Sequence, residues 1–151
     1  MTVGRAKTVL TISGSGKVNV NKGNKNDSGN PTVILADKAT LEYTTATANL
    51  GAASITLGGG ATFAFQNGGS ALALPSPITL PTDGTATLRI GGDRLRGRKQ
   101  TIKTGVEPDA ADHLVVDPAS AALAGRKVTL AVEDGNLVLN FQPKGLMVIV
   151  K

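Results

Sequence analysis

The sequence of 151 residues contains no cysteine and no tryptophan. Without cysteine the chain has no disulfide bond, no thiolate metal site and no cysteine nucleophile. Aromatic residues make up only 3%, one tyrosine and three phenylalanines. A hydrophobic core therefore has to be built from Val, Ile, Leu and Ala, and these small aliphatic side chains favour a narrow, regular interior. No apolar run approaches the about 18 residues that a membrane-spanning helix needs.

Groups suited to catalysis are also scarce, and His113 is the only histidine. A histidine base needs a nucleophile and an orienting group beside it. Its neighbours are Asp112 and Leu114, and the chain has no nucleophile-elbow pattern. Ser15-Gly16-Lys17 fails as a phosphate-binding loop, because Thr11 stands where the first glycine is required. We interpret His113 as a surface residue in a loop and predict no catalytic site and no cofactor.

Acidic residues are densest in one segment, which contains Glu107, Asp109, Asp112 and Asp117. Carboxylates can surround a calcium ion, but this spacing lacks the glycine-containing loop of calcium sites. We expect these carboxylates to pair instead with the basic side chains of residues 94–103, where exposed pairs contribute ~0–1 kcal/mol each. The sequence therefore predicts no metal site.

Basic residues are in excess, with 16 Lys and Arg against 11 Asp and Glu, for a net charge of +5. Much of this excess lies in a basic patch formed by Arg94, Arg96, Arg98, Lys99 and Lys103. Such a patch attracts polyanions, including acidic glycans. The simpler interpretation is a solvated loop that keeps the surface soluble. No aromatic residue lies among these side chains, so a stacking platform for single-stranded nucleic acid is missing.

What the sequence does contain favours β structure. Its 19 glycines and many Thr and Asn residues indicate numerous turns and strands with polar outer faces. An apolar triplet recurs, and the first residues of successive triplets are 23, 22 and 23 positions apart. The triplets are Leu10-Thr11-Ile12, Val33-Ile34-Leu35, Ile55-Thr56-Leu57 and Ile78-Thr79-Leu80. This regular spacing indicates an internal repeat.

A second strand follows each triplet after a turn, and these strands are spaced by 23, 22 and 25 residues. They are Val18-Asn19-Val20, Leu41-Glu42-Tyr43, Phe63-Ala64-Phe65 and Leu88-Arg89-Ile90. Alternation along a strand sends Leu41 and Tyr43 to one face and Glu42 to the other. A weaker third strand is predicted at residues 48–50 and 72–74.

The triplets and the second strands recur with nearly the same period. This shared period predicts an all-β fold, with residues 1–90 forming a β-solenoid of about four coils of 22–23 residues. Each coil buries its apolar face only by stacking on its neighbours. Equivalent inward positions are therefore expected to stack, namely Leu10, Val33, Ile55 and Ile78. The alternative is a β-sandwich or roll of successive hairpins, in which the same turns join antiparallel strands.

Residues 91–151 lose the period and are predicted to form a C-terminal capping segment of the same domain. A hairpin is expected from strands 128–132 and 137–141, because Asp134-Gly135 tolerates the positive φ of a tight turn. Residues 117–125 fit a short helix or turn that starts at Asp117 and ends at Gly125. Residues 146–150 predict a final strand that is buried on both faces or meets a partner.

The glycine-rich unit Ile55-Thr56-Leu57-Gly58-Gly59-Gly60-Ala61-Thr62-Phe63 resembles the autotransporter-associated β-strand repeats of large bacterial surface proteins. The tail is similar to the end of such passenger regions, with Gly125-Arg126-Lys127-Val128-Thr129-Leu130 leading to Asp134-Gly135-Asn136-Leu137-Val138-Leu139. The resemblance covers most of the chain. It implies a right-handed parallel β-helix, export, and a role in surface display or adhesion.

The sequence therefore predicts a non-enzymatic structural segment of a secreted or cell-surface protein: a rigid spacer, an adhesin passenger or a self-assembling element. The alternative is a carbohydrate- or polyanion-binding β module that uses the basic patch. No apolar segment follows Arg5 and Lys7, so residues 1–10 are not a signal peptide. We expect a mature or excised part of an exported protein, and the alternative is a protein that stays inside the cell. The expected partners are neighbouring coils of a longer chain or further copies stacked end to end, through an uncapped end near Leu10 and Val18. An acidic glycan is a further candidate partner, and neither specific nucleic-acid binding nor membrane insertion is expected.

Overall fold

The computed structural model describes residues 9–12, 17–20, 32–36, 38–48, 54–69, 73–74 and 77–142. Within these residues the chain forms strands and turns, one short 3-10 helix, η1 (Ala121–Leu123), and no α-helix. The strands make three sheets, which we name sheets A, B and C. The predicted all-β class is confirmed.

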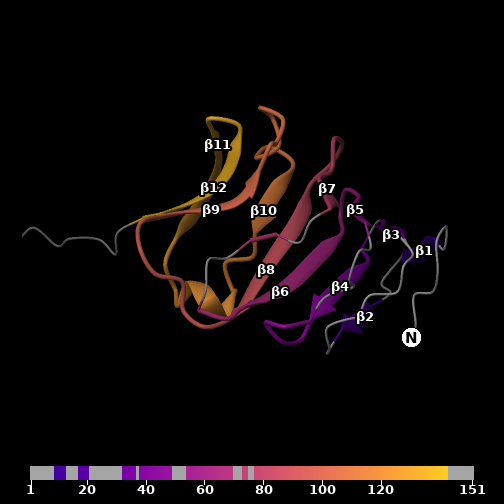
Figure 1. Cartoon of the computed structure of the whole chain (residues 1–151), viewed down its shortest axis with the longest axis horizontal. Helices are drawn as coiled ribbons and strands as arrows, with labels where there is room; N and C mark the ends of the chain where they lie inside the picture. Colours follow the sequence, from indigo (N-terminus) through magenta and orange to yellow (C-terminus); the bar gives the residue numbers. More distant parts are fainter. Residues whose placement is uncertain are drawn as a thin grey trace, which may run out of the picture.

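Sheets A and B are parallel and stack successive coils of the chain (Figure 1). Sheet A has the order β1 (Val9–Ile12), β3 (Thr32–Leu35), β5 (Ser54–Leu57) and β7 (Ile78–Thr79). Sheet B has the order β10 (Leu114–Val116), β8 (Ala86–Gly92), β6 (Thr62–Asn67), β4 (Thr40–Tyr43) and β2 (Lys17–Val20). Each passage through both sheets returns one rung further along, which gives a β-solenoid of about three turns. Successive hairpins would give antiparallel neighbours, so the sandwich alternative is excluded.

The register of sheet A follows the repeat of the sequence. Leu10 pairs with Val33, Val33 with Ile55, and Ile55 with Ile78. Val33, Ile55 and Ile78 are buried, with at most 5% of their surface exposed. The predicted stacking of these positions is confirmed. Fully burying one such side chain stabilises the fold by ~1.5–3 kcal/mol, which is why the repeat fixes the register.

The register of sheet B likewise follows the recurring second strands of the sequence. Val18 pairs with Leu41, Leu41 with Phe63, and Phe63 with Leu88. The scarce aromatic residues concentrate here. The Phe63 ring lies 5.2 Å from Tyr43, edge to face, and 5.2 Å from Phe65, stacked. These contacts add ~0.5–1.5 kcal/mol each to the stabilisation from burial.

The predicted third strand is not formed at its described positions. Ala48, Ala73 and Leu74 lie outside strands, while residues 49–50 and 72 fall outside the described part of the chain. Ala48 and Leu74 are nevertheless buried in the core. The Leu74 N–H donates to the Ile102 carbonyl oxygen at 2.7 Å. Long-range pairing with a later segment therefore replaces coil-to-coil pairing at this position.

Sheet B continues beyond residue 90, where the sequence period blurs. β10 pairs in parallel with the first part of β8, Leu114 with Ala86 and Val116 with Leu88. Further along β8, the Ile90 N–H donates to the Ser120 hydroxyl at 3.0 Å. Ser120 precedes η1, so the predicted short helix or turn between 117 and 125 is confirmed.

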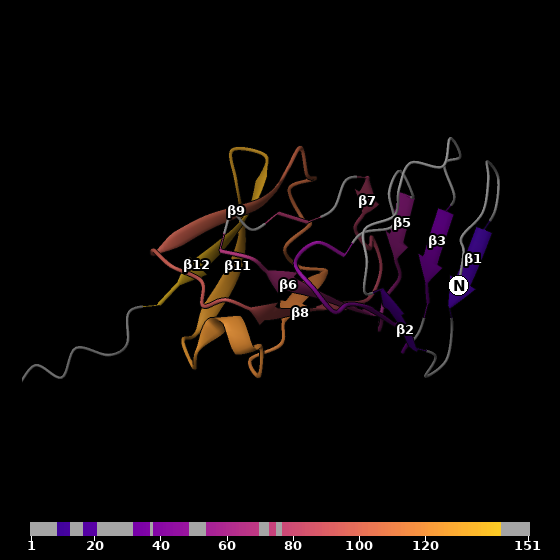
Figure 2. The ribbon, with the colours of Figure 1, turned by 60° about the horizontal axis from the view of Figure 1, so that its bottom comes forward.

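Sheet C is antiparallel and has the order β11 (Val128–Glu133), β12 (Asn136–Phe141) and β9 (Lys99–Thr104). The predicted hairpin is confirmed, and its turn residues Asp134 and Gly135 have φ of 50° and 70°. Leu137 and Leu139 join the core cluster of the solenoid. Sheet C therefore covers the end of the solenoid opposite β1 (Figure 2). The predicted strand at 146–150 lies outside the described residues.

Candidate functional site

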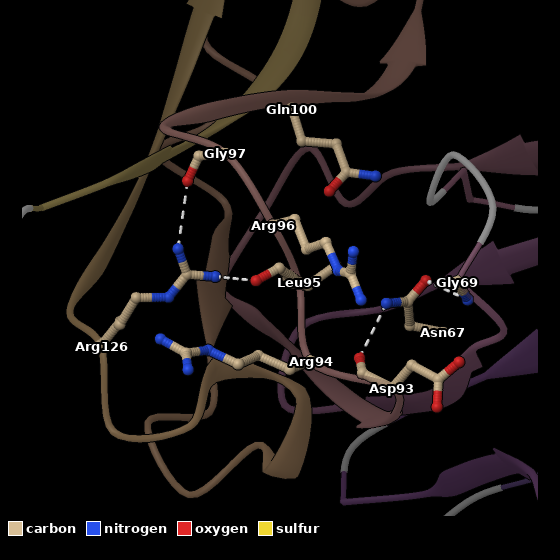
Figure 3. A pocket seen from close by; sticks show the side chains of 9 residues that line it. All are labelled: Asn67, Gly69, Asp93, Arg94, Leu95, Arg96, Gly97, Gln100 and Arg126. Atoms are coloured by element: carbon tan, nitrogen blue, oxygen red, sulfur yellow. Dashed lines mark hydrogen bonds between the residues drawn. The ribbon is translucent and has the colours of Figure 1, made fainter.

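A hollow of about 950 Å³ lies where the solenoid meets sheet C (Figure 3). We name it the arginine hollow. Its walls come from the end of β6, the β8–β9 loop, β9 and the η1–β11 connection. The lining residues are Asn67, Gly69, Asp93, Arg94, Leu95, Arg96, Gly97, Gln100 and Arg126.

Asn67 anchors the start of the β8–β9 loop. Its side-chain Nδ2 donates to the Asp93 carbonyl oxygen at 2.7 Å, and the Asp93 N–H donates back to the Asn67 carbonyl oxygen at 2.9 Å. Its Oδ1 accepts from the Gly69 N–H at 3.3 Å. Only 5% of Asn67 is exposed, and a buried amide needs such partners to offset its desolvation. The backbone at Asp93 is therefore fixed relative to the preceding coil.

Arg126 holds the rest of the loop. Its Nη1 donates to the Gly97 carbonyl oxygen at 3.1 Å, and its Nη2 donates to the Leu95 carbonyl oxygen. The guanidinium lies over the Phe141 ring, 4.3 Å from its centroid, a cation–π contact. Leu95 is buried, and its N–H donates to the Ala122 carbonyl oxygen at 2.9 Å. The Arg126 side chain thus joins the loop to sheet C, and the Leu95 backbone joins the loop to η1.

Four side chains around the hollow, that of Asp93 among them, have no hydrogen bond or ion pair within the described residues. Arg94 and Arg96 are exposed, and Gln100 is half-buried. Figure 3 shows Gln100 and Arg96 directed toward the space between β9 and the end of β6. Because three of the lining side chains are cationic and only Asp93 is anionic, the hollow carries a net positive charge.

The structure divides the predicted basic patch. Arg94 and Arg96 line the arginine hollow, whereas Arg98 is exposed outside it. Lys99 forms an ion pair with Glu133 on the neighbouring hairpin. Lys103 lines a separate hollow of about 240 Å³ beside Leu74 and Ile102. The five residues therefore do not form one continuous site.

Sequence reasoning missed Arg126 and Gln100. Arg126 lies 31 and 29 positions from the residues whose carbonyl oxygens it binds. Those partners are backbone atoms, which leave no signature in residue types. Gln100 lies within the basic segment, but its polar neighbours gave no reason to place it beside Asn67.

The expected pairing of the acidic segment with the basic patch is wrong for Asp117, which binds Arg89 on β8 with an Nε–Oδ2 distance of 2.8 Å. Arg89 faces outward from the rung beside it, closer than any side chain of the patch. The hydrogen bond from Arg89, with a second from the Ala119 N–H, lowers the pKa of Asp117. Hydrogen bonds from Lys99 and Asn140 likewise lower the pKa of Glu133.

His113 lies in the turn before β10, half-buried, with Nδ1 2.9 Å from the Gly84 carbonyl oxygen. Its Nε2 is 3.9 Å from an Asp109 carboxylate oxygen. Across the described ranges, no group of three or more His, Cys, Asp or Glu side chains is placed to hold a metal ion.

Among the residues that the structure describes, no helix has the length and apolar character needed to cross a membrane. Comparison of the chain with protein-family models, with curated proteins and with solved structures gave no match.

Proposed function

We propose that this chain is a non-enzymatic structural segment of a secreted or cell-surface protein, in which the solenoid serves as a rigid spacer or as an element of end-to-end assembly. The regular register of sheets A and B supports this proposal. Each rung repeats the inward positions of the last, so further coils can be added without a change in the core. The resemblance to autotransporter-associated repeats points to surface display or adhesion as the setting.

The observation that carries the proposal is the difference between the two ends of the solenoid. At one end β10 is the last strand of sheet B, and sheet C lies against it and adds Leu137 and Leu139 to the core. At the other end, within the described residues, β1 pairs only with β3 and β2 only with β4. Unpaired strand edges are templates for further pairing. We propose that β1 and β2 stack on the coil of a neighbouring segment or of a second copy.

Light scattering across a concentration series tests this assembly, with one variant at each end. Asn19→Lys adds a charge to the β2 edge, where charge opposes edge-to-edge pairing. Val115→Lys is the matched control on β10, where Val115 is 49% exposed. We expect the average mass of the unmodified chain to rise with concentration, and only Asn19→Lys to suppress the rise.

Two results would contradict the proposal. A mass that stays monomeric at every concentration would mean that the β1–β2 end is closed in the isolated chain. Suppression by Val115→Lys alone would place the assembling edge at β10. Far-UV circular dichroism of each variant checks that the fold is retained.

A further inference from the structure

Beyond the structural role, we propose that the arginine hollow binds an acidic sugar unit of a polysaccharide, one that carries a carboxylate or a sulfate group. Three features carry the inference: a pair of uncommitted arginines, a loop already fixed in one conformation, and hydroxyl-binding groups on the same wall.

The arginine pair supplies the anion recognition. Arg94 and Arg96 flank Leu95, which is 2% exposed and pins the backbone between them. Both guanidiniums are exposed at the hollow and lack protein partners within the described residues. A guanidinium donates two parallel hydrogen bonds to a carboxylate or sulfate, which makes arginine well suited to such ligands. Figure 3 shows the Arg96 guanidinium on the side of Asn67 and the Arg94 guanidinium on the side of Arg126, so each offers its own contact to an anion. Because neither has a carboxylate partner within the described residues, we infer an anion as the ligand.

The loop is organised before any ligand binds. Arg126 holds the carbonyl oxygens of Leu95 and Gly97, and Asn67 holds the backbone of Asp93. Little backbone freedom therefore remains to be lost on binding, and preorganisation of this kind increases affinity. Arg126 acts here as a positioning residue, because both of its terminal nitrogens are already engaged with the loop.

The other lining groups favour a sugar over a phosphate polymer. The Asp93 carboxylate can accept hydrogen bonds from the hydroxyl groups of a sugar, which a polyphosphate chain does not offer. The Gln100 amide both donates and accepts, and it makes no hydrogen bond within the described residues. None of the nine lining residues is aromatic, so bases of a nucleic acid would find nothing to stack on. A hollow of about 950 Å³ is within the size range of small-ligand sites.

Binding of the full chain to four probes tests the proposal: heparin as a sulfated glycan, polygalacturonate as a carboxylated glycan, inorganic polyphosphate, and double-stranded DNA. Affinities are measured by calorimetry over a range of salt concentrations. We expect binding to at least one of the two acidic glycans, and the glycan that binds identifies the acidic group. Stronger binding of polyphosphate or DNA than of both glycans would overturn the proposal, as would binding of no glycan at low salt.

Two double variants with equal loss of charge locate the site. Arg94→Ala with Arg96→Ala removes two guanidiniums of the hollow, whereas Arg98→Ala with Lys127→Ala removes two exposed cations outside it. We expect the first to weaken glycan binding about tenfold or more and to reduce the slope of log affinity against log salt by about 2. The second should leave most of the affinity intact. An equal loss of glycan affinity in the two double variants would mean that binding depends on overall charge rather than on the arginine hollow, and would overturn the proposal.

Two single variants separate ligand contact from loop positioning. Asp93→Asn should lower the ratio of glycan affinity to polyphosphate affinity, because it removes a charged acceptor for sugar hydroxyl groups while the loss of one negative charge favours both polyanions. Arg126→Lys keeps the charge but cannot span both carbonyl oxygens, so glycan affinity should fall while the salt slope stays unchanged. An Arg126→Lys variant with full affinity would remove Arg126 from the argument, and an Asp93→Asn variant with unchanged preference would contradict the choice of a sugar.

Discussion

Gly92 lies at the end of β8, where its Cα lies close to the backbone of the preceding coil and where the loop to the arginine hollow begins. Its φ is +77°, and a Cβ atom there would overlap the Asn67 carbonyl oxygen and lie 3.0 Å from the Asn67 nitrogen. Both obstacles are backbone atoms of the neighbouring coil. They cannot move aside as the tip of a flexible side chain can, so Gly92→Ala should strain the fold itself.

The size of the effect follows from two terms. An alanine with positive φ costs about 1–2 kcal/mol, and overpacking against fixed atoms typically adds about 1–3 kcal/mol. The sum of roughly 2–5 kcal/mol is a large part of the about 5–15 kcal/mol by which domains are stable. For a chain of this length it lowers the melting temperature by roughly 4–20 °C.

Gly105 provides the matched control. Its φ is +62°, but nothing lies within 4 Å of an added Cβ atom. Gly105→Ala therefore carries only the backbone cost of about 1–2 kcal/mol, partly offset by the reduced freedom of the unfolded chain. Thermal and urea unfolding of both variants measures the difference. If Gly92→Ala were no less stable than Gly105→Ala, close packing of β8 against β6 would be refuted as the reason for glycine at this position.

Three further predictions concern the core, the buried amide and the acid response. Ile55→Asp should unfold the chain, because an unpaired buried carboxylate costs several kcal/mol, whereas Thr56→Asp on the outer face should retain the far-UV circular dichroism of a folded protein. Asn67→Ala should cost about 1–3 kcal/mol in urea unfolding, since the Asp93 carbonyl oxygen loses its donor, and a loss below 0.5 kcal/mol (about the scatter of surface changes) would contradict this. The lowered pKa of Asp117 means that its bond to Arg89 stabilises the fold above the unfolded pKa of 3.8 and that this contribution is lost as pH falls through the lower folded pKa. Asp117→Asn should therefore have a lower free energy of unfolding than the unmodified chain at pH 7, and the two should become similar in strong acid. A difference in unfolding free energy that does not change with pH would contradict this prediction.

The sequence by itself determined the repeat, the all-β class and the hairpin, whereas the parallel pairing in the structure decided between solenoid and sandwich. Inward residues such as Val33 and Ile55 recur at the coil length and therefore predict which positions are buried together. The hairpin rests on a local rule, because Asp134-Gly135 accepts the positive φ that a tight turn requires. Both inferences depend on residue type and on short-range or periodic spacing, which a sequence displays directly.

Tertiary structure alone decided the site. Ile102 is the one buried residue of β9, and the rest of this strand is polar. The sequence therefore shows no apolar alternation that would predict a strand paired with β12. The position of Arg126 beside the Leu95 and Gly97 carbonyl oxygens follows from how sheet C lies against the end of the solenoid. Charged side chains are long and flexible, and their partners are chosen by which elements meet rather than by sequence proximity. For that reason one run of basic residues lies in four separate environments, and Arg94 and Arg96 line the hollow without a hydrogen-bond or ion-pair partner among the described residues.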